Sequence, residues 1–266
     1  MRLELGFRAF DPHELLAHVL AVRLGLYRDE GVQVELRDLT FGPADAVQVS
    51  CGSALLARLR GGQLTVHLVA ARAPLFWVVG RAPLPSTGSR VASYPEGSPP
   101  ALFAAALLPG ARFLPARDDA ARIGLILMGD ADGAVVSSAE PESRLAEHGL
   151  VRLRAFAEEV SVPTTGLAVP QPLAADEAVA AAVRAQRGAL AALHARPDDV
   201  EATLIETFRY DRVSAERAVR ELATWFTAGG RIDRGTAERA IAFAAAALGV
   251  PPLPVEDVYA AGALAR

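Results

Sequence analysis

Cys51 is the only cysteine in this sequence, and its type and position could do chemistry. It directly follows the apolar segment "AVQVS" and precedes Gly52, Ser53 and a helical pattern. A helix N-terminus lowers the pKa of a thiol and favours the nucleophilic thiolate. The same position also suits a small residue that lines a ligand site or fills the core. The sequence leaves these three interpretations open, and it holds no second cysteine for a disulfide.

A second candidate group surrounds His13. Asp11 is a good N-cap, Pro12 fits the first helical position, and Glu14 follows the cap by three residues, so we expect a helix to start here. The positive end of that helix disfavours the charged form of His13 and leaves a neutral hydrogen-bond donor. Ligand contact and a solvated surface position both stay open for this residue.

Two blocks of alternating strands and helices would position these residues. Residues 1–82 and 88–160 follow this pattern, and the turn-rich segment "APLPSTGSR" joins them. The alternation predicts an α/β protein with mainly parallel sheets, and the turn-rich segment favours two small sheets over one large sheet. Residues 174–248 then follow a mostly helical pattern.

Ligands of open α/β sheets bind beyond the carboxyl ends of the strands. Four predicted strand-to-helix junctions qualify here: residues 7–14, 49–53, 92–98 and 135–140. Their helix starts offer free backbone N–H groups and a positive dipole end, which together hold a polar or anionic molecule without a dedicated cation. Ser98 is expected to cap one of these helices through its side chain.

The candidate ligand-binding residues lie at these junctions and on the later segment "VPTTGLAV". Their aromatic rings could wall a ligand, and their hydroxyl groups could donate to ligand oxygens, although serines at such places are also ordinary helix caps. They are Phe10, Asp11, His13, Cys51, Gly52, Ser53, Phe76, Tyr94, Gly97, Ser98, Ser137, Ser138, Thr164 and Thr165. No catalytic triad, nucleotide fingerprint or metal cluster has persuasive spacing, so we name no catalytic residue and expect neither metal nor cofactor.

Composition narrows the classes of partner. The net charge is −4 and aromatic residues make up 6% of the 266 residues, which argues against nucleic-acid binding. No uncharged apolar run reaches the roughly 18 residues of a membrane-spanning helix. The start "MRLELGFRAF" lacks the features of a signal peptide. We therefore expect a cytoplasmic protein as the sequence stands, or an extracytoplasmic one if a leader was removed.

Several segments resemble the substrate-binding proteins of nitrate, sulfonate and taurine transporters. The segment "LAHVLAVRLGLYRDEGVQVELRD" resembles their opening, and "GPADAVQVSCGSALLARLRGGQLTVHLVAA" resembles the segment that follows. The segment "DADGAVVSSAEP" is similar to a strand of their second lobe, and "VPTTGLAV" to the strand by which the chain returns to the first lobe. The resemblance covers nearly the whole chain.

The resemblance implies the type II periplasmic-binding-protein-like fold: two α/β lobes, a two-strand hinge, extra C-terminal helices and a ligand in the cleft between the lobes. Lobe 1 would comprise residues 1–84 with 170–266, and lobe 2 residues 85–169. The implied function is that of a binding protein of an ABC importer, sulfonate-, nitrate- or thiamine-precursor-like. It would hold a small polar or anionic organic ligand and have a permease as its partner.

The same resemblance also implies an alternative. Some cytoplasmic enzymes share this fold, including thiamine-pyrimidine synthases, enzymes of the futalosine route to menaquinone, and aryl-sulfinate desulfinases. Desulfinases of this fold use a cysteine with a histidine and an arginine. His13, His67 and Arg72 are the candidate partners of Cys51 in this alternative, while the absence of a catalytic cluster favours a binding protein.

Overall fold

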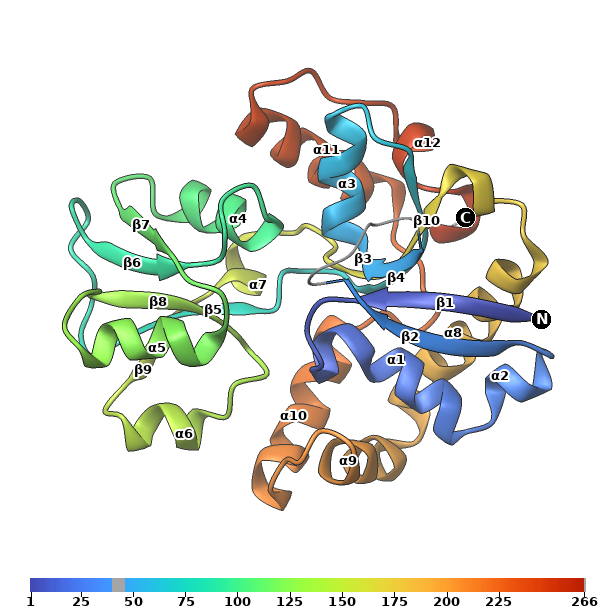
Figure 1. The fold of residues 1–266 in the computed structure, drawn as a ribbon, viewed down its shortest axis with the longest axis horizontal. Coiled ribbons are helices and arrows are strands. Elements are labelled where there is room, and N and C mark those ends of the chain that lie inside the picture. Colours follow the sequence, from blue (N-terminus) through green and yellow to red (C-terminus); the bar gives the residue numbers. More distant parts are fainter. Residues whose placement is uncertain (40–45, 266) are drawn as a thin grey trace. The chain divides into compact units, whose positions relative to one another are not determined.

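The computed structural model describes residues 1–39 and 46–265. The chain forms two compact units, one made of Met1–Arg72 with Val162–Arg266 and the other of Ala73–Ser161. Each unit contains its own five-stranded mixed sheet. The predicted α/β class with two small, mainly parallel sheets is therefore confirmed (Figure 1).

The sheet of the first unit has the strand order β2-β1-β3-β10-β4. Its strands are β1 (Arg2–Phe7), β2 (Gln33–Asp38), β3 (Val47–Ser50), β4 (Leu64–Ala71) and β10 (Thr165–Pro170). Strand β1 runs parallel to β2 and β3, and β10 runs antiparallel to β3 and β4. The carboxyl ends of β1, β3 and β4 therefore share one edge of this sheet.

Helices cover both faces of this sheet, with α1, α2 and α8 on one side and α3, α11 and α12 on the other (Figure 1). In this unit, the helices that precede β10 in the chain are α1 (Pro12–Arg23), α2 (Leu26–Asp29) and α3 (Cys51–Leu59). The helices after it are η1 (Gln171–Leu173), α8 (Glu177–Ala195), α9 (Pro197–Glu206), α10 (Arg212–Trp225), α11 (Arg234–Leu248), α12 (Val255–Val258) and η2 (Ala261–Ala263). The mostly helical pattern after residue 174 is thus confirmed.

The sheet of the second unit has the order β7-β6-β8-β5-β9. Its strands are β5 (Phe76–Gly80), β6 (Arg90–Ser93), β7 (Arg112–Pro115), β8 (Gly133–Ser137) and β9 (Val151–Ala155). The helices are α4 (Pro99–Leu107), α5 (Asp119–Leu127), α6 (Glu142–Glu147) and α7 (Phe156–Glu159). Helix α5 packs on β6 and β8, and Ile123 and Ile126 join Trp77 in the core.

The lobe boundaries differ from those expected at residues 84/85 and 169/170. Residues Phe76–Gly80 belong to the second unit because β5 pairs with β8 and β9. Residues Thr165–Pro170 belong to the first unit because β10 pairs with β3 and β4. The segment 82–90 is a turn between two strands of one sheet, so its composition marks a turn and not a passage between units.

Within the described part of the chain, no helix combines the length and the apolar character that crossing a membrane requires.

Candidate functional site

The first junction of the first unit is built around the start of α1. The Asp11 Oδ1 atom accepts the backbone N–H of Glu14 at 2.9 Å, which confirms the predicted cap. The Glu14 carboxylate reaches back and accepts the backbone N–H groups of Arg8 at 2.8 Å and Ala9 at 3.1 Å. Burial, with the charge of Asp11, raises the pKa of Glu14 to about 7. This reciprocal capping fixes the loop that carries Phe10.

Phe10 is an exposed aromatic ring at this junction. It is 58% exposed, yet its ring contacts Phe7 and Phe208, with centroid distances of 6.1 and 5.7 Å. His13 lies half-buried in the first turn of α1, two residues beyond the cap. A large ring held in place but open to solvent is a suitable surface for packing against a ligand.

Cys51 is buried completely and does not face solvent. Its Sγ atom donates to the backbone oxygen of Leu68 at 3.3 Å. A Cβ atom added at Gly166 would lie 1.9 Å from the Leu68 oxygen and 2.6 Å from Sγ, so the thiol fills tightly packed space. Burial raises the pKa of Cys51, and the expectation of a lowered pKa is wrong because desolvation outweighs the helix N-terminus. This environment suits the packing interpretation.

The neighbours of Cys51 gather at the same edge of the sheet. Ser50, which sequence analysis did not single out, caps α3 by accepting the N–H of Ser53 at 3.2 Å. The backbone N–H of Gly52 donates to the oxygen of Thr164 at 3.2 Å. Thr165 is buried and pairs with Ser50 in the sheet, whereas the side chains of Ser53 and Thr164 are half-buried. The structure thus brings these predicted residues together.

At the carboxyl edge of the second unit, an aromatic cluster joins the start of β5 to the end of β6. The rings of Phe76 and Tyr94 pack edge to face with centroids 5.3 Å apart. Phe156, which sequence analysis missed, is buried behind them at 6.2 Å from Phe76. Phe76 and Tyr94 are half-buried, so both keep surface at this edge.

The carboxylate of Asp119 connects three elements at this edge. It accepts a hydrogen bond from the guanidinium of Arg122 and forms an ion pair with it. The Tyr94 hydroxyl lies 3.5 Å from Oδ1. The backbone N–H of Ser137 donates to its two oxygens at 3.3 and 3.2 Å. The sequence pattern did not indicate a role for Asp119 or Arg122. The available signal was an arginine on the apolar stripe of a predicted helix, one turn after an acidic start.

The remaining predicted residues of the second unit form hydrogen bonds with nearby backbone groups or shape a turn. Ser98 occupies the N-cap position of α4, but its hydroxyl donates to the Pro95 oxygen at 2.6 Å, so the predicted side-chain cap is wrong. Gly97 is exposed and has a φ of 81°, which suits the tight turn before it. The Ser137 hydroxyl accepts the N–H of Ala139 at 3.2 Å, and the Ser138 N–H donates to the Leu75 oxygen at 3.0 Å.

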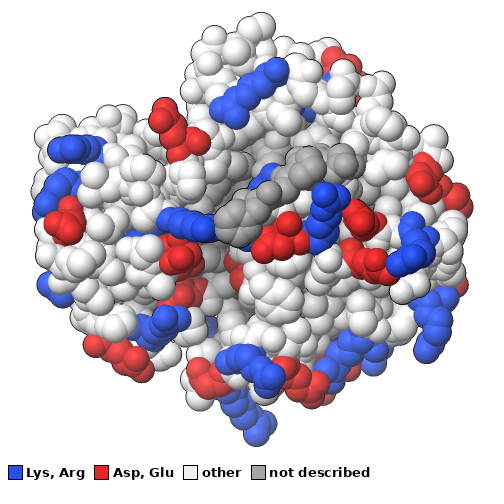
Figure 2. Space-filling model, viewed as in Figure 1, with Lys and Arg blue, Asp and Glu red and all other residues white. Residues whose placement is uncertain are grey.

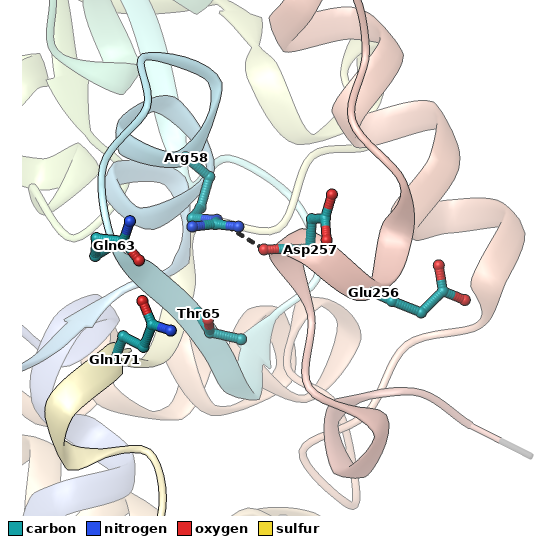
Figure 3. A pocket seen from close by; sticks show the side chains of 6 residues that line it. All are labelled: Arg58, Gln63, Thr65, Gln171, Glu256 and Asp257. Atoms are coloured by element: carbon teal, nitrogen blue, oxygen red, sulfur yellow. Dashed lines mark hydrogen bonds between the residues drawn. The ribbon is translucent and has the colours of Figure 1, made fainter.

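A polar pocket of about 340 Å³ lies elsewhere in the first unit (Figure 3). Its lining comes from α3, β4, η1 and α12 and the loops beside them: Arg58, Gln63, Thr65, Gln171, Glu256 and Asp257. The Arg58 side chain points toward α12 and donates to the Asp257 oxygen at 2.7 Å. The pocket lies where β4 begins, at the sheet edge opposite the candidate junctions. The pocket therefore differs from the candidate site in its position, and its lining is polar and open to solvent.

The charges on the face shown in Figure 2 are of both signs and are interspersed. Among residues 1–39 and 46–265, no group of three His, Cys, Asp or Glu side chains is arranged to hold a metal ion. The geometry of the two carboxyl edges is thus one of aromatic rings, hydroxyl groups and backbone N–H groups, which bind organic molecules by packing and hydrogen bonds.

Comparison with known proteins identifies the fold. No family model and no curated protein sequence matches the chain. The alkanesulfonate-binding protein SsuA from Xanthomonas axonopodis pv. citri, bound to MOPS, superposes with a TM-score of 0.70 at 15% identity, covering 100% of this chain and 98% of that one. The ligand-binding component of an ABC-type import system from Staphylococcus aureus, with zinc bound, gives 0.74 at 12% identity and coverages of 97% and 96%.

An enzyme shares the same architecture. The desulfurization enzyme DSZB superposes with a TM-score of 0.69 at 14% identity, covering 97% of this chain and 96% of that one. At such identities the likeness establishes the fold. The chain has the type II periplasmic binding protein fold that the sequence predicted.

Proposed function

We propose that this chain is the ligand-binding component of an ABC-type importer and binds a small organic molecule at the carboxyl edges of its sheets. The observation that carries the proposal is the placement of solvent-accessible aromatic rings beside helix starts. Phe10 stands at the start of α1 in the first unit, and Phe76 and Tyr94 stand beside Ser137 in the second. The ligand-binding component of an ABC-type import system shares this fold and supports the transport role.

The proposed mode of binding follows from the groups at these edges. Aromatic side chains supply large contact areas, and a few polar groups fix the orientation of a ligand. Ser53 and Thr164 offer half-buried hydroxyl groups near the start of α3. The importer role implies a membrane permease as the partner and an extracytoplasmic location, which fractionation of cells expressing the native gene would test.

A desulfinase-like enzyme is the second candidate, because DSZB shares the fold. The environment of Cys51 argues against it. A completely buried thiol whose pKa is raised is a poor nucleophile. The guanidinium of Arg72 donates to the Thr224 oxygen at 2.8 Å and lies 5.8 Å from the Trp225 ring, so it is already engaged on α10.

The proposal is tested by a thermal-shift screen followed by titration calorimetry of the strongest binder. The screen contains alkanesulfonates, aromatic acids, pyrimidines, chorismate-derived compounds and organic amines. We expect one compound to raise the melting temperature and to bind with one-to-one stoichiometry, without being consumed. Turnover of the bound compound, detected by mass spectrometry, would instead support the enzyme. A screen without any binder would contradict the proposal.

A further inference from the structure

The carboxylate of Asp119 is a fixed anion at the carboxyl edge of the second unit. It begins α5, where the backbone N–H groups and the helix dipole favour negative charge. Both of its oxygens lie within hydrogen-bond distance of the Ser137 N–H at the end of β8, and Oδ1 also faces the Tyr94 hydroxyl. Asp119 therefore occupies the donors that an anionic ligand would use at this junction.

The cation at this edge is neutralised from within the protein. Arg122 is 1% exposed, and it donates from Nη2 to Asp119 and from Nη1 to the Ala116 oxygen at 2.8 Å. Its guanidinium lies 3.6 Å from the centroid of the Tyr94 ring. The Nε atom has no hydrogen-bond partner among the described residues. A buried arginine needs a counter-charge, and Asp119 provides it.

A second carboxylate lies near the first. The side chain of Glu140 is 10% exposed and forms an ion pair with Arg144, with Nε and Oε1 3.2 Å apart. Burial raises the pKa of Glu140, and the charge of Asp119 contributes to that rise, so the two carboxyl groups are within electrostatic reach. An anionic group placed at this edge would meet both of them.

We propose that Asp119 determines specificity by excluding anionic groups from the carboxyl edge of the second unit. The ligand then presents an uncharged or positively charged group at this edge, beside the half-buried rings of Phe76 and Tyr94. This inference rests on the proposed ligand-binding function and narrows it. It separates the chain from a sulfonate receptor, although SsuA shares its fold.

The first test uses the wild-type protein and two pairs of probes that differ in charge: benzenesulfonate with benzylamine, and ethanesulfonate with ethylamine. In calorimetric titrations, the amine of each pair should bind at least about tenfold more tightly than its sulfonate, because a desolvated charge pair differs from a repulsive contact by at least that factor. Tighter binding of the sulfonates would overturn the inference.

The second test removes the fixed anion while keeping its shape. Asp119→Asn should gain affinity for benzenesulfonate and for inorganic sulfate by about tenfold or more, because it removes the carboxylate that repels these anions and leaves the buried charge of Arg122 without a counter-ion. The double variant Asp119→Asn with Arg122→Met should lose that gain. The control is Asp118→Asn at the neighbouring carboxylate. Asp118 caps α5 by accepting the Ala121 N–H at 2.7 Å and is not the counter-ion of Arg122. Equal anion affinity in Asp119→Asn and wild type would overturn the inference.

Thermal unfolding keeps the test informative if Asp119→Asn is destabilised. Sodium sulfate should raise its melting temperature more than it raises that of wild type or Asp118→Asn, because an anion bound to Arg122 stabilises only the folded variant. An equal shift in all three proteins would contradict the inference. A wild-type protein that binds none of the screened compounds would contradict the proposed function, whereas sulfate rescue of Asp119→Asn would still support the role of Asp119.

Discussion

His18 lies in the core of the first unit, where its Nδ1 atom is 3.1 Å from the Tyr27 hydroxyl. The Tyr27 oxygen accepts from the Gln186 side chain at 2.8 Å, so its own proton can be donated to Nδ1 of a neutral imidazole. Burial lowers the pKa of His18 from 6.5 to about 4. The histidine therefore titrates at a lower pH in the folded chain than in the unfolded chain.

The shift of His18 predicts acid sensitivity. Its contribution to stability is present above pH 6.5 and is lost as the pH falls toward 4, because the unfolded histidine binds a proton first. The loss amounts to about 3 kcal/mol. Urea unfolding at pH 7.5 and pH 4.5 should show this loss in wild type and a smaller one in His18→Gln. The exposed His148, changed to Gln, serves as the control and should behave as wild type does.

Glu14 predicts a dependence of the opposite sign. Its pKa is raised from 4.5 to about 7, so its contribution to stability is present below pH 4.5 and is lost as the pH rises through 7. The free energy of unfolding of Glu14→Gln, relative to wild type, should therefore increase between pH 5 and pH 8. The exposed Glu96, changed to Gln, should show no such trend. A flat difference for Glu14→Gln would show that the carboxyl group ionises normally.

Residue types and positions predicted part of the candidate site. Strand ends in a parallel sheet share an edge, so the meeting of Tyr94 and Ser137 followed from the pattern of elements. Phe76 lies at the start of β5 and reaches the same edge because β5 runs antiparallel to β8, which the pattern did not reveal. Asp119 and Arg122 were missed because their roles depend on burial, which spacing alone does not reveal. Cys51 was misjudged for the same reason, since its helix position suggested a lowered pKa and its desolvation raises it.

At the scale of elements, Gly166 sets how closely β10 can approach β4 and α3. Replacing it with alanine would place a methyl group 1.9 Å from the Leu68 oxygen and 2.6 Å from the Cys51 sulfur. We expect Gly166→Ala to destabilise the protein by about 3 kcal/mol, because backbone must move to relieve the clash. Gly124→Ala on α5 meets nothing within 4 Å and should be neutral or stabilising. Equal unfolding free energies for the two variants would contradict the packing described for Cys51.

Helix starts show what local sequence can specify. The Asp11 cap was predicted correctly because its side chain has a free N–H three residues ahead. Ser98 has a suitable residue type and stands at the expected position, yet its hydroxyl bonds back to Pro95. Local competition between two acceptors or donors decides such cases, and the sequence pattern is the same for both outcomes.

At the scale of the whole molecule, the sequence predicted the two-sheet architecture but misplaced its boundaries. Alternating strands and helices determine the fold class. Pairing partners are distant in sequence, so the assignment of Phe76–Gly80 to the second sheet depends on hydrogen bonds to β8 and β9 that local patterns do not encode. The sequence left the turn-rich segment 82–90 open as a linker or a turn, and it is a turn between β5 and β6 of one sheet.

The central claim is that a small molecule binds at the carboxyl edges of the sheets, and not in the pocket at the opposite edge of the first unit. The decisive measurement is calorimetric titration of the strongest compound from the screen into wild type, Phe10→Ala and Gln171→Ala. Phe10 is exposed at the start of α1, and Gln171 is an exposed residue of the polar pocket, so both variants should fold as wild type does. We predict that Phe10→Ala weakens binding by about tenfold or more while Gln171→Ala leaves it unchanged. Loss of binding in Gln171→Ala with full binding in Phe10→Ala would contradict the claim.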